Sequence, residues 1–120
     1  MEIDQNIAYN SLIQTIEQSS ELDDWNKAIL KIEIDVNYLG LSCRYYFTGG
    51  KSESYRLKKV DNLGECIRWL HTFTTQMGQT KWNLAIFTLE KNLKFNMEFI
   101  WDEEKQQSVD EINKNKNKFG

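Results

Sequence analysis

The sequence predicts an α+β fold in which a mostly antiparallel five-stranded sheet carries its helices on one face, in the order α-β-β-β-α-β-β. Five segments alternate apolar and polar residues, which is the pattern of a strand with one face in water. Two longer segments repeat apolar residues every three or four positions, which is the spacing of an amphipathic helix. Antiparallel hairpins with intervening helices favour a single sheet with the helices packed against one side.

Two segments have the helical pattern. The first helix is expected over residues 3–20, with Asp4 near the positive end of its dipole. The second is expected over residues 61–78, with Gly78 as its C-terminal stop. Their apolar stripes consist of Tyr9, Leu12, Ile13 and Ile16 in the first helix and Leu63, Cys66, Ile67, Leu70, Phe73 and Met77 in the second.

The five strands are expected at residues 26–38, 41–48, 51–58, 81–89 and 93–101. Gly40 and the pair Gly49-Gly50 are expected to form turns after the first two strands, and the apolar face of the first strand extends to Val36. The alternation also gives the sheet a polar face, which we expect to be largely open to solvent. Side chains expected on that face include Glu33, Asp35, Arg44, Tyr46, Phe87, Glu98 and Ile100.

The chain length indicates a single domain, which we place at residues 1–104. The remaining residues, 105–120, form a charged tail that is rich in Asn and Lys. Such a composition buries little apolar surface, so we expect a short helical stretch at most and partial disorder.

The net charge of −3 makes the chain a poor candidate for direct nucleic-acid binding, which needs a basic surface. A mildly acidic domain suits a basic protein partner better. The N-terminus lacks the features of a signal peptide, and no window reaches the roughly 20 apolar residues of a membrane span. We therefore expect a cytoplasmic protein that does not bind a membrane.

Few residues suggest catalysis, and we expect no enzymatic activity, no cofactor and no metal. Cys43 and Cys66 lack metal-ligand spacing and fall on apolar faces, so buried thiols are expected. His71 is the one histidine, and its pairing with Cys43 as base and nucleophile is conceivable in principle. An acid–base pair of Glu33 and Glu98 is an alternative, but an open sheet face offers little enclosure for it.

Three segments together resemble the YezG-like family of bacterial immunity proteins, the antitoxins of polymorphic toxin systems. They are DWNKAILKIEI at 24–34, RYYF at 44–47, and the predicted closing hairpin KWNLAIFTLE at 81–90 with KFNMEFIWD at 94–102. The resemblance implies a protein that binds a cognate toxin domain, usually a basic nuclease, and blocks its active site. Immunity proteins of contact-dependent inhibition systems also have this size and charge.

The resemblance and the predicted polar face lead to a set of expected partner contacts. These are Glu33, Asp35, Tyr46, Glu98, Asp102, Glu103 and Glu104. Their carboxylates would imitate the charge of a nuclease substrate and speed the encounter. A second interpretation has Phe87 and Ile100 covered by the tail or by the first helix. Two other functions remain open, a secretion chaperone or adaptor and a small enzyme, and the chain could be a monomer or a homodimer through an edge strand.

Overall fold

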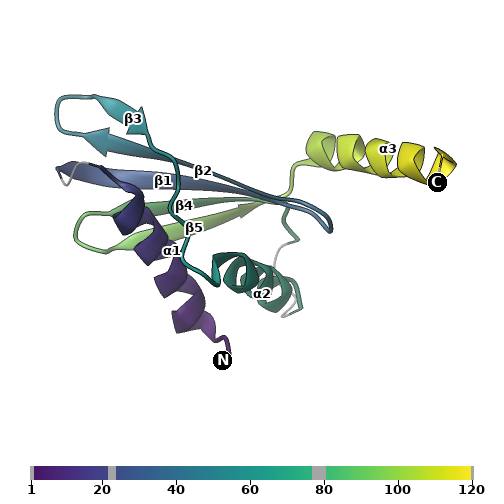
Figure 1. The fold of residues 1–120 in the computed structure, drawn as a ribbon, viewed down its shortest axis with the longest axis horizontal. Coiled ribbons are helices and arrows are strands. Elements are labelled where there is room, and N and C mark those ends of the chain that lie inside the picture. Colours follow the sequence, from purple (N-terminus) through teal and green to yellow (C-terminus); the bar gives the residue numbers. More distant parts are fainter. Residues whose placement is uncertain (1, 22–23, 77–80, 120) are drawn as a thin grey trace.

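The computed structural model describes residues 2–21, 24–76 and 81–119 (Figure 1). It confirms the predicted α+β fold, with a five-stranded antiparallel sheet of strand order β3-β2-β1-β4-β5. Along the chain the elements are α1 (Gln5–Ser19), β1 (Trp25–Ile34), β2 (Leu39–Phe47), β3 (Ser52–Ser54), α2 (Leu63–Gln76), β4 (Leu84–Glu90), β5 (Phe95–Ile100) and α3 (Glu103–Phe119). The expected stop at Gly78 lies outside the described residues.

α1 and α2 pack against one face of the sheet (Figure 1). α1 begins at Asp4, whose Oδ1 accepts a hydrogen bond from the Ile7 amide at 2.8 Å and so caps the helix. Leu12 and Ile16 follow at helical spacing and are fully buried among the strand side chains. In α2, the predicted stripe residues Leu63, Cys66, Ile67 and Leu70 are buried, and Met77 lies outside the described residues. The opposite face of the sheet stays uncovered by both helices.

The turn between β1 and β2 differs from the prediction. Asp35 was expected on the sheet face, but it lies in the turn, where its Oδ1 accepts from the Asn37 amide at 2.6 Å and its own amide donates to the Tyr38 carbonyl at 2.9 Å. The chain therefore turns directly after β1, and Val36 is 88% exposed instead of buried. The turn expected at Gly40 is also wrong, because Gly40 belongs to β2.

The prediction for β4 chose the wrong face. Phe87 was expected on the open side, but it pairs with Leu30 of β1 and is fully buried with it in the core. Ile86 takes the outward position, between Lys31 of β1 and Glu98 of β5. The interpretation in which the first helix covers Phe87 fits this burial, since the Tyr9 ring of α1 stacks on the Phe87 ring at 6.4 Å between centroids. It is wrong for Ile100, which pairs with Leu84 and stays partly exposed on the other face of the sheet.

β3 has three residues and is much shorter than the strand expected over 51–58. The chain leaves β2 after Ser54 because the following segment bonds to α1. The Lys58 amide donates to Ser19 Oγ at 2.7 Å, and Gln18 Nε2 donates to the Lys58 carbonyl. These long-range bonds hold the segment that follows β3 on the side of the sheet covered by α1.

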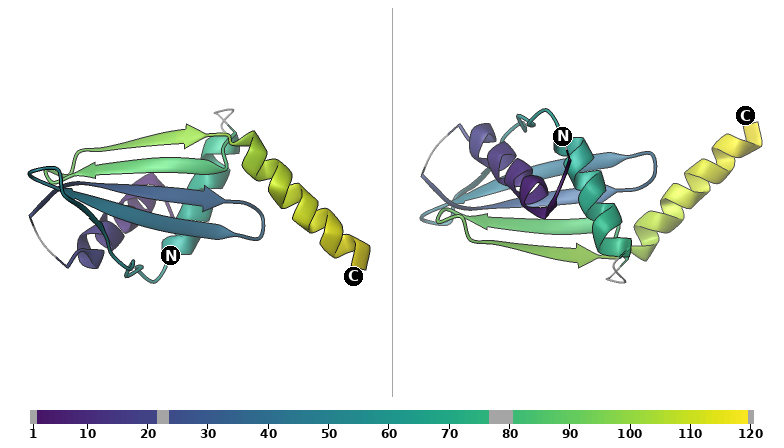
Figure 2. Two further views of the ribbon diagram at one scale, coloured as in Figure 1. Left: turned by 90° about the horizontal axis from the view of Figure 1, so that it is seen from above. Right: turned by 90° about the horizontal axis from the view of Figure 1, so that it is seen from below.

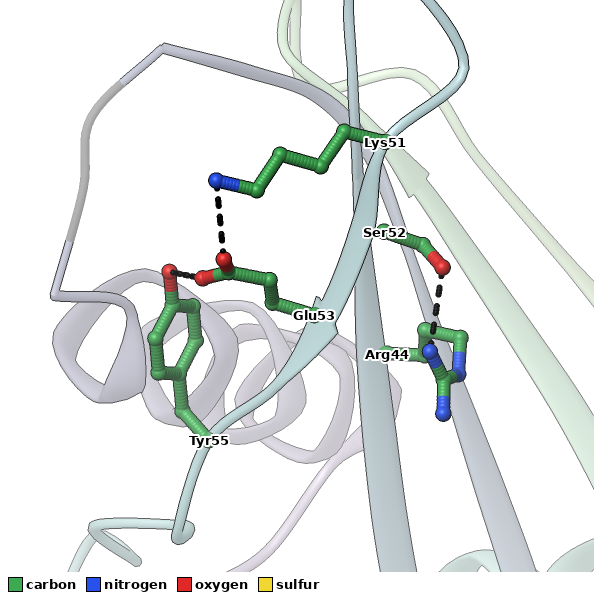
Figure 3. A network of polar contacts seen from close by, with 5 residues as sticks. All are labelled: Arg44, Lys51, Ser52, Glu53 and Tyr55. Carbon is green, nitrogen blue, oxygen red and sulfur yellow. Dashed lines mark hydrogen bonds and ion pairs between the residues drawn. The ribbon is translucent and has the colours of Figure 1, made fainter.

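The turn that joins β2 to β3 is confirmed, since Gly49 and Gly50 have φ angles of +91° and +88°, which glycine adopts without strain. Beyond it, the side chains of β3 separate onto the two faces of the sheet (Figure 3). Arg44 Nη1 donates to Ser52 Oγ at 3.0 Å on one face. On the other, the Glu53 carboxylate accepts from Tyr55 Oη at 2.6 Å and pairs with Lys51 at 3.0 Å. These contacts lower the pKa of Glu53.

α3 extends away from the rest of the molecule and is longer than the short helical stretch expected for the tail (Figures 1 and 2). Asp102 caps it, because its Oδ1 accepts from the Lys105 amide at 3.0 Å. Glu103 and Glu104 occupy the first turn, where negative charge favours the helix dipole. Among the described residues, no helix combines the length and the apolar composition needed to cross a membrane.

Candidate partner-binding face

The face of the sheet opposite α1 and α2 is the principal candidate site, and we call it the open face (Figure 2, left). Strand register places its side chains, since residues paired across antiparallel strands point to the same side. Its members are Lys27, Ile29, Lys31, Glu33, Ser42, Arg44, Tyr46, Ser52, Ser54, Leu84, Ile86, Thr88, Glu90, Lys94, Asn96, Glu98 and Ile100. No described helix packs on this face.

An apolar stripe crosses the open face diagonally, and we call it the open-face stripe. It consists of Ile29, Tyr46, Leu84, Ile86 and Ile100, all of which are partly exposed. Leu84 pairs directly with Ile100, and Ile86 follows two residues along β4. Ile29 lies one strand further, diagonal to Ile86, so neighbouring side chains are within contact reach.

The stripe passes through a shallow hollow of about 410 Å³. Ile29 and Ile86 contribute its apolar lining, and Lys31 and Arg44 contribute its charged lining. Its other lining residues are Ser42, Cys43, Tyr46 and Ser54. A hollow of this kind can receive an anchoring side chain of a partner, and such anchors contribute most to many protein interfaces.

Charge on the open face is balanced rather than acidic. Among the described residues it carries four cations, Lys27, Lys31, Arg44 and Lys94, and three carboxylates, Glu33, Glu90 and Glu98. Lys31 pairs with Glu33 at 3.3 Å, and the Lys27 ammonium lies 5.3 Å from the centre of the Tyr46 ring. Exposed pairs of this kind add little stability, so their side chains can exchange partners on binding.

The structure places the predicted contact residues in three locations. Glu33, Tyr46 and Glu98 belong to the open face, as expected. Asp35 lines a separate cleft of about 340 Å³ near the base of α3, together with His71, Trp82, Trp101 and Gln106 among others. Asp102, Glu103 and Glu104 lie at the start of α3.

Two of the three acids at the start of α3 already have structural partners. The Asp102 carboxylate caps the helix, and the Glu103 carboxylate accepts from Trp101 Nε1 at 2.5 Å. Glu104 is exposed and is therefore the member of this group best placed to meet a partner.

Sequence reasoning missed Ile29, Leu84 and Ile86, which form most of the open-face stripe. A signal for Ile29 was present, because it stands at an outward position between Lys27 and Lys31. Leu84 and Ile86 could be placed only after the register of β4 was known.

The residue pairs considered for catalysis are not brought together. Glu33 and Glu98 lie on β1 and β5 with β4 between them, so two strand spacings of about 4.8 Å separate their backbones. Cys43 lines the hollow near β3, whereas His71 lines the cleft at the base of α3. His71 has a packing role there, because its Nε2 lies 2.9 Å from the Trp82 carbonyl and its ring meets the Trp82 ring edge-on.

Both cysteines are buried free thiols, as predicted, and Cys43 gives a test of the core. Burial raises the pKa of Cys43 from 9.0 to about 11. Above pH 9 the unfolded thiol loses its proton while the folded thiol keeps it, so stability falls as pH rises from 9 towards 11. The slope from this group approaches roughly 1.4 kcal/mol per pH unit.

Urea denaturation at a series of pH values would measure this loss. A Cys43→Ala variant is expected to lack the slope between pH 9 and pH 10, although its absolute stability is lower. Above pH 10 both proteins should lose stability, because burial also raises the pKa of Tyr45. Parallel curves for the two proteins from pH 9 upward would contradict the assignment.

Among the described residues, no three potential metal ligands lie close enough together to hold a metal ion. Comparison with known proteins found no family model and no curated protein that matches this chain. What the site can do must therefore be inferred from its geometry and from the resemblance noted in the sequence. That geometry is an uncovered sheet face with an apolar stripe, a hollow and a charged border.

Proposed function

We propose that this chain is a protein-binding module whose partner is a toxin domain that it neutralises, as an immunity protein does. The observation that carries the binding part is the open-face stripe, a set of partly exposed apolar side chains on a face that no described helix covers. The resemblance of three sequence segments to YezG-like immunity proteins supports the toxin part. A nuclease is the expected toxin, because that family usually inhibits nucleases.

The partner would bury the open-face stripe at the centre of the interface. Stable interfaces bury roughly 800 Å² per partner and combine an apolar centre with a polar border. Lys31, Glu33, Arg44 and Glu98 provide that border, and their alternating charges would reject partners with the wrong charge pattern. Inhibition follows when the docked face covers the active site of the toxin.

Attraction over longer distance would come from the net charge rather than from the open face. The chain carries −3, and Glu103 and Glu104 concentrate negative charge at the start of α3. A nuclease needs a basic surface to bind phosphates, so the two proteins would attract each other. Association should therefore slow as salt is added, while the docked complex depends mainly on the stripe.

Replacement of Ile86 by aspartate tests the proposal. It places a charge at the centre of the stripe, where burial without a partner is costly, so affinity for the toxin should fall at least about 100-fold. The toxin candidate is the product of the neighbouring gene, expressed in cells with the wild-type chain, with Ile86→Asp, or alone. Growth is expected with the wild type and arrest in the other two cases.

The matched control is Gln14→Asp, an exposed position of α1 on the opposite side of the molecule. This variant should protect the cells as the wild type does, and circular dichroism should show that both variants fold. Protection by Ile86→Asp at wild-type affinity would refute the choice of face. Binding to the partner with no effect on its toxicity would instead support the adaptor function.

A further inference from the structure

No described strand pairs with the outer edge of β5. The strand order places β5 at one end of the sheet, and Figure 2 shows no other strand beside it there. Its pairing with β4 is regular, from Leu84 opposite Ile100 to Leu89 opposite Phe95, without a bulge. A regular edge strand of this length presents a template for another strand.

The free hydrogen-bonding groups of this edge can be assigned. The Glu90 amide donates to the Lys94 carbonyl at 2.8 Å, so alternate residues from Lys94 onward bond to β4. The amides and carbonyls of Phe95, Met97 and Phe99 consequently point outward. None of them has a hydrogen-bond partner among the described residues.

β5 has few of the features that usually prevent an edge strand from pairing with another chain. The chain contains no proline, and the strand has neither a bulge nor a lysine within it. Apolar side chains flank the edge instead, with Leu93 53% and Phe95 43% exposed. The Phe95 ring is held by ring contacts to Tyr9 at 4.9 Å and to Phe87 at 5.3 Å between centroids, so it is already positioned for contact.

We propose that β5 pairs antiparallel with β5 of a second copy of this chain, with the two-fold axis at Asn96. In this register the backbone of Phe95 bonds to the backbone of Met97 in the second copy. By symmetry, the backbone of Met97 bonds to that of Phe95 in the second copy. Lys94 lies opposite Glu98 of the second copy, and Glu98 opposite its Lys94, which gives two cross-strand ion pairs.

Neighbouring registers lose this complementarity. An axis at Met97 places Lys94 opposite Ile100, and an axis at Glu98 places two glutamates opposite each other. The partly exposed Phe95 ring would be covered by Met97 of the second copy in the register at Asn96. The charges of the edge therefore specify a second copy of the same strand as its occupant.

Pairing at this edge produces a continuous ten-stranded sheet and leaves both open faces uncovered on the same side. The inference does not rest on the proposed function, and the pair would present two partner-binding faces instead of one. A dimer of this kind could hold two toxin molecules at once.

The test measures the mass of the purified chain in solution by light scattering over a range of concentrations. We expect a shift from 14.2 kDa towards twice that mass as concentration rises. Lys94→Glu and Glu98→Lys should each weaken dimerisation about tenfold, because each opposes like charges. The double variant Lys94→Glu/Glu98→Lys should restore it, since the ion pairs are re-formed with reversed signs.

Met97→Pro provides an independent variant. It removes an outward amide and leaves the bonds to β4 intact, so it should abolish the dimer while the fold persists. Met97→Ala is its matched control and should keep most of the dimer. A wild-type chain that stays monomeric at its highest soluble concentration, or a dimer that none of these variants weakens, would overturn the inference.

Discussion

Replacing Phe87 with alanine is expected to lower the free energy of unfolding by about 3–5 kcal/mol. Phe87 is fully buried and pairs with Leu30 of the neighbouring strand β1. Its ring contacts the rings of Tyr9 and Phe95. Removing the Phe87 ring takes away its apolar contacts with β1, α1 and β5, and leaves a cavity that the strands cannot close. The loss is large against the roughly 5–15 kcal/mol that stabilises a typical domain.

Ile86→Ala is the matched control, because Ile86 directly precedes Phe87 in β4 and points to the open face. Its side chain is partly exposed, so the expected loss is about 1 kcal/mol or less. Urea denaturation of the two variants gives both values. Equal losses, or a larger loss at Ile86, would mean that β4 presents the opposite face to the helices.

Replacing Asn83 with alanine is expected to cost about 2–4 kcal/mol and to loosen the start of α3. Asn83 is 2% exposed and bonds the backbone of Asp102 twice, with Nδ2 donating to its carbonyl at 2.8 Å and Oδ1 accepting from its amide at 2.7 Å. Alanine leaves both backbone groups without their partner. Because Asp102 caps α3, the first turn of that helix would lose its anchor as well.

Two measurements separate the local effect from the global one. Urea denaturation gives the loss of stability, and hydrogen exchange should be faster at the amides of Asp102 and Lys105 than in the wild type. Asn26→Ala is the control, since Asn26 is exposed and its side chain makes one bond, to Thr48 Oγ1 at 2.9 Å. A loss at Asn83 no greater than at Asn26, where about 0.5 kcal/mol is expected, would show that the bonds to Asp102 do not hold α3.

The sequence predicted the element order and the sheet because alternation and helical spacing are local signals. It failed where the outcome depends on distant residues. β4 has apolar residues on both faces, Leu84 and Ile86 on one and Phe87 and Leu89 on the other, so alternation alone could not choose between them. The pairing of Phe87 with Leu30 made that choice, and it involves residues more than fifty positions apart.

The early end of β3 has a similar cause. Lys58 lies outside the sheet because its amide donates to Ser19 Oγ of α1, and no residue near Lys58 in the sequence predicts that bond. The cap at Asp102, by contrast, could have been predicted. An aspartate followed by Glu103 and Glu104 is a common helix start, and the same three acids are also expected partner contacts.

The projection of α3 has a hydrodynamic consequence. The radius of gyration is 15.8 Å and the molecule measures 50 × 32 × 25 Å, whereas a compact domain of this length would have a radius of gyration of roughly 14 Å. An elongated particle experiences more friction than a sphere of equal mass. A monomer of this chain should therefore elute early from a gel-filtration column, at the position of a heavier globular protein, and its elution volume alone would imitate a dimer.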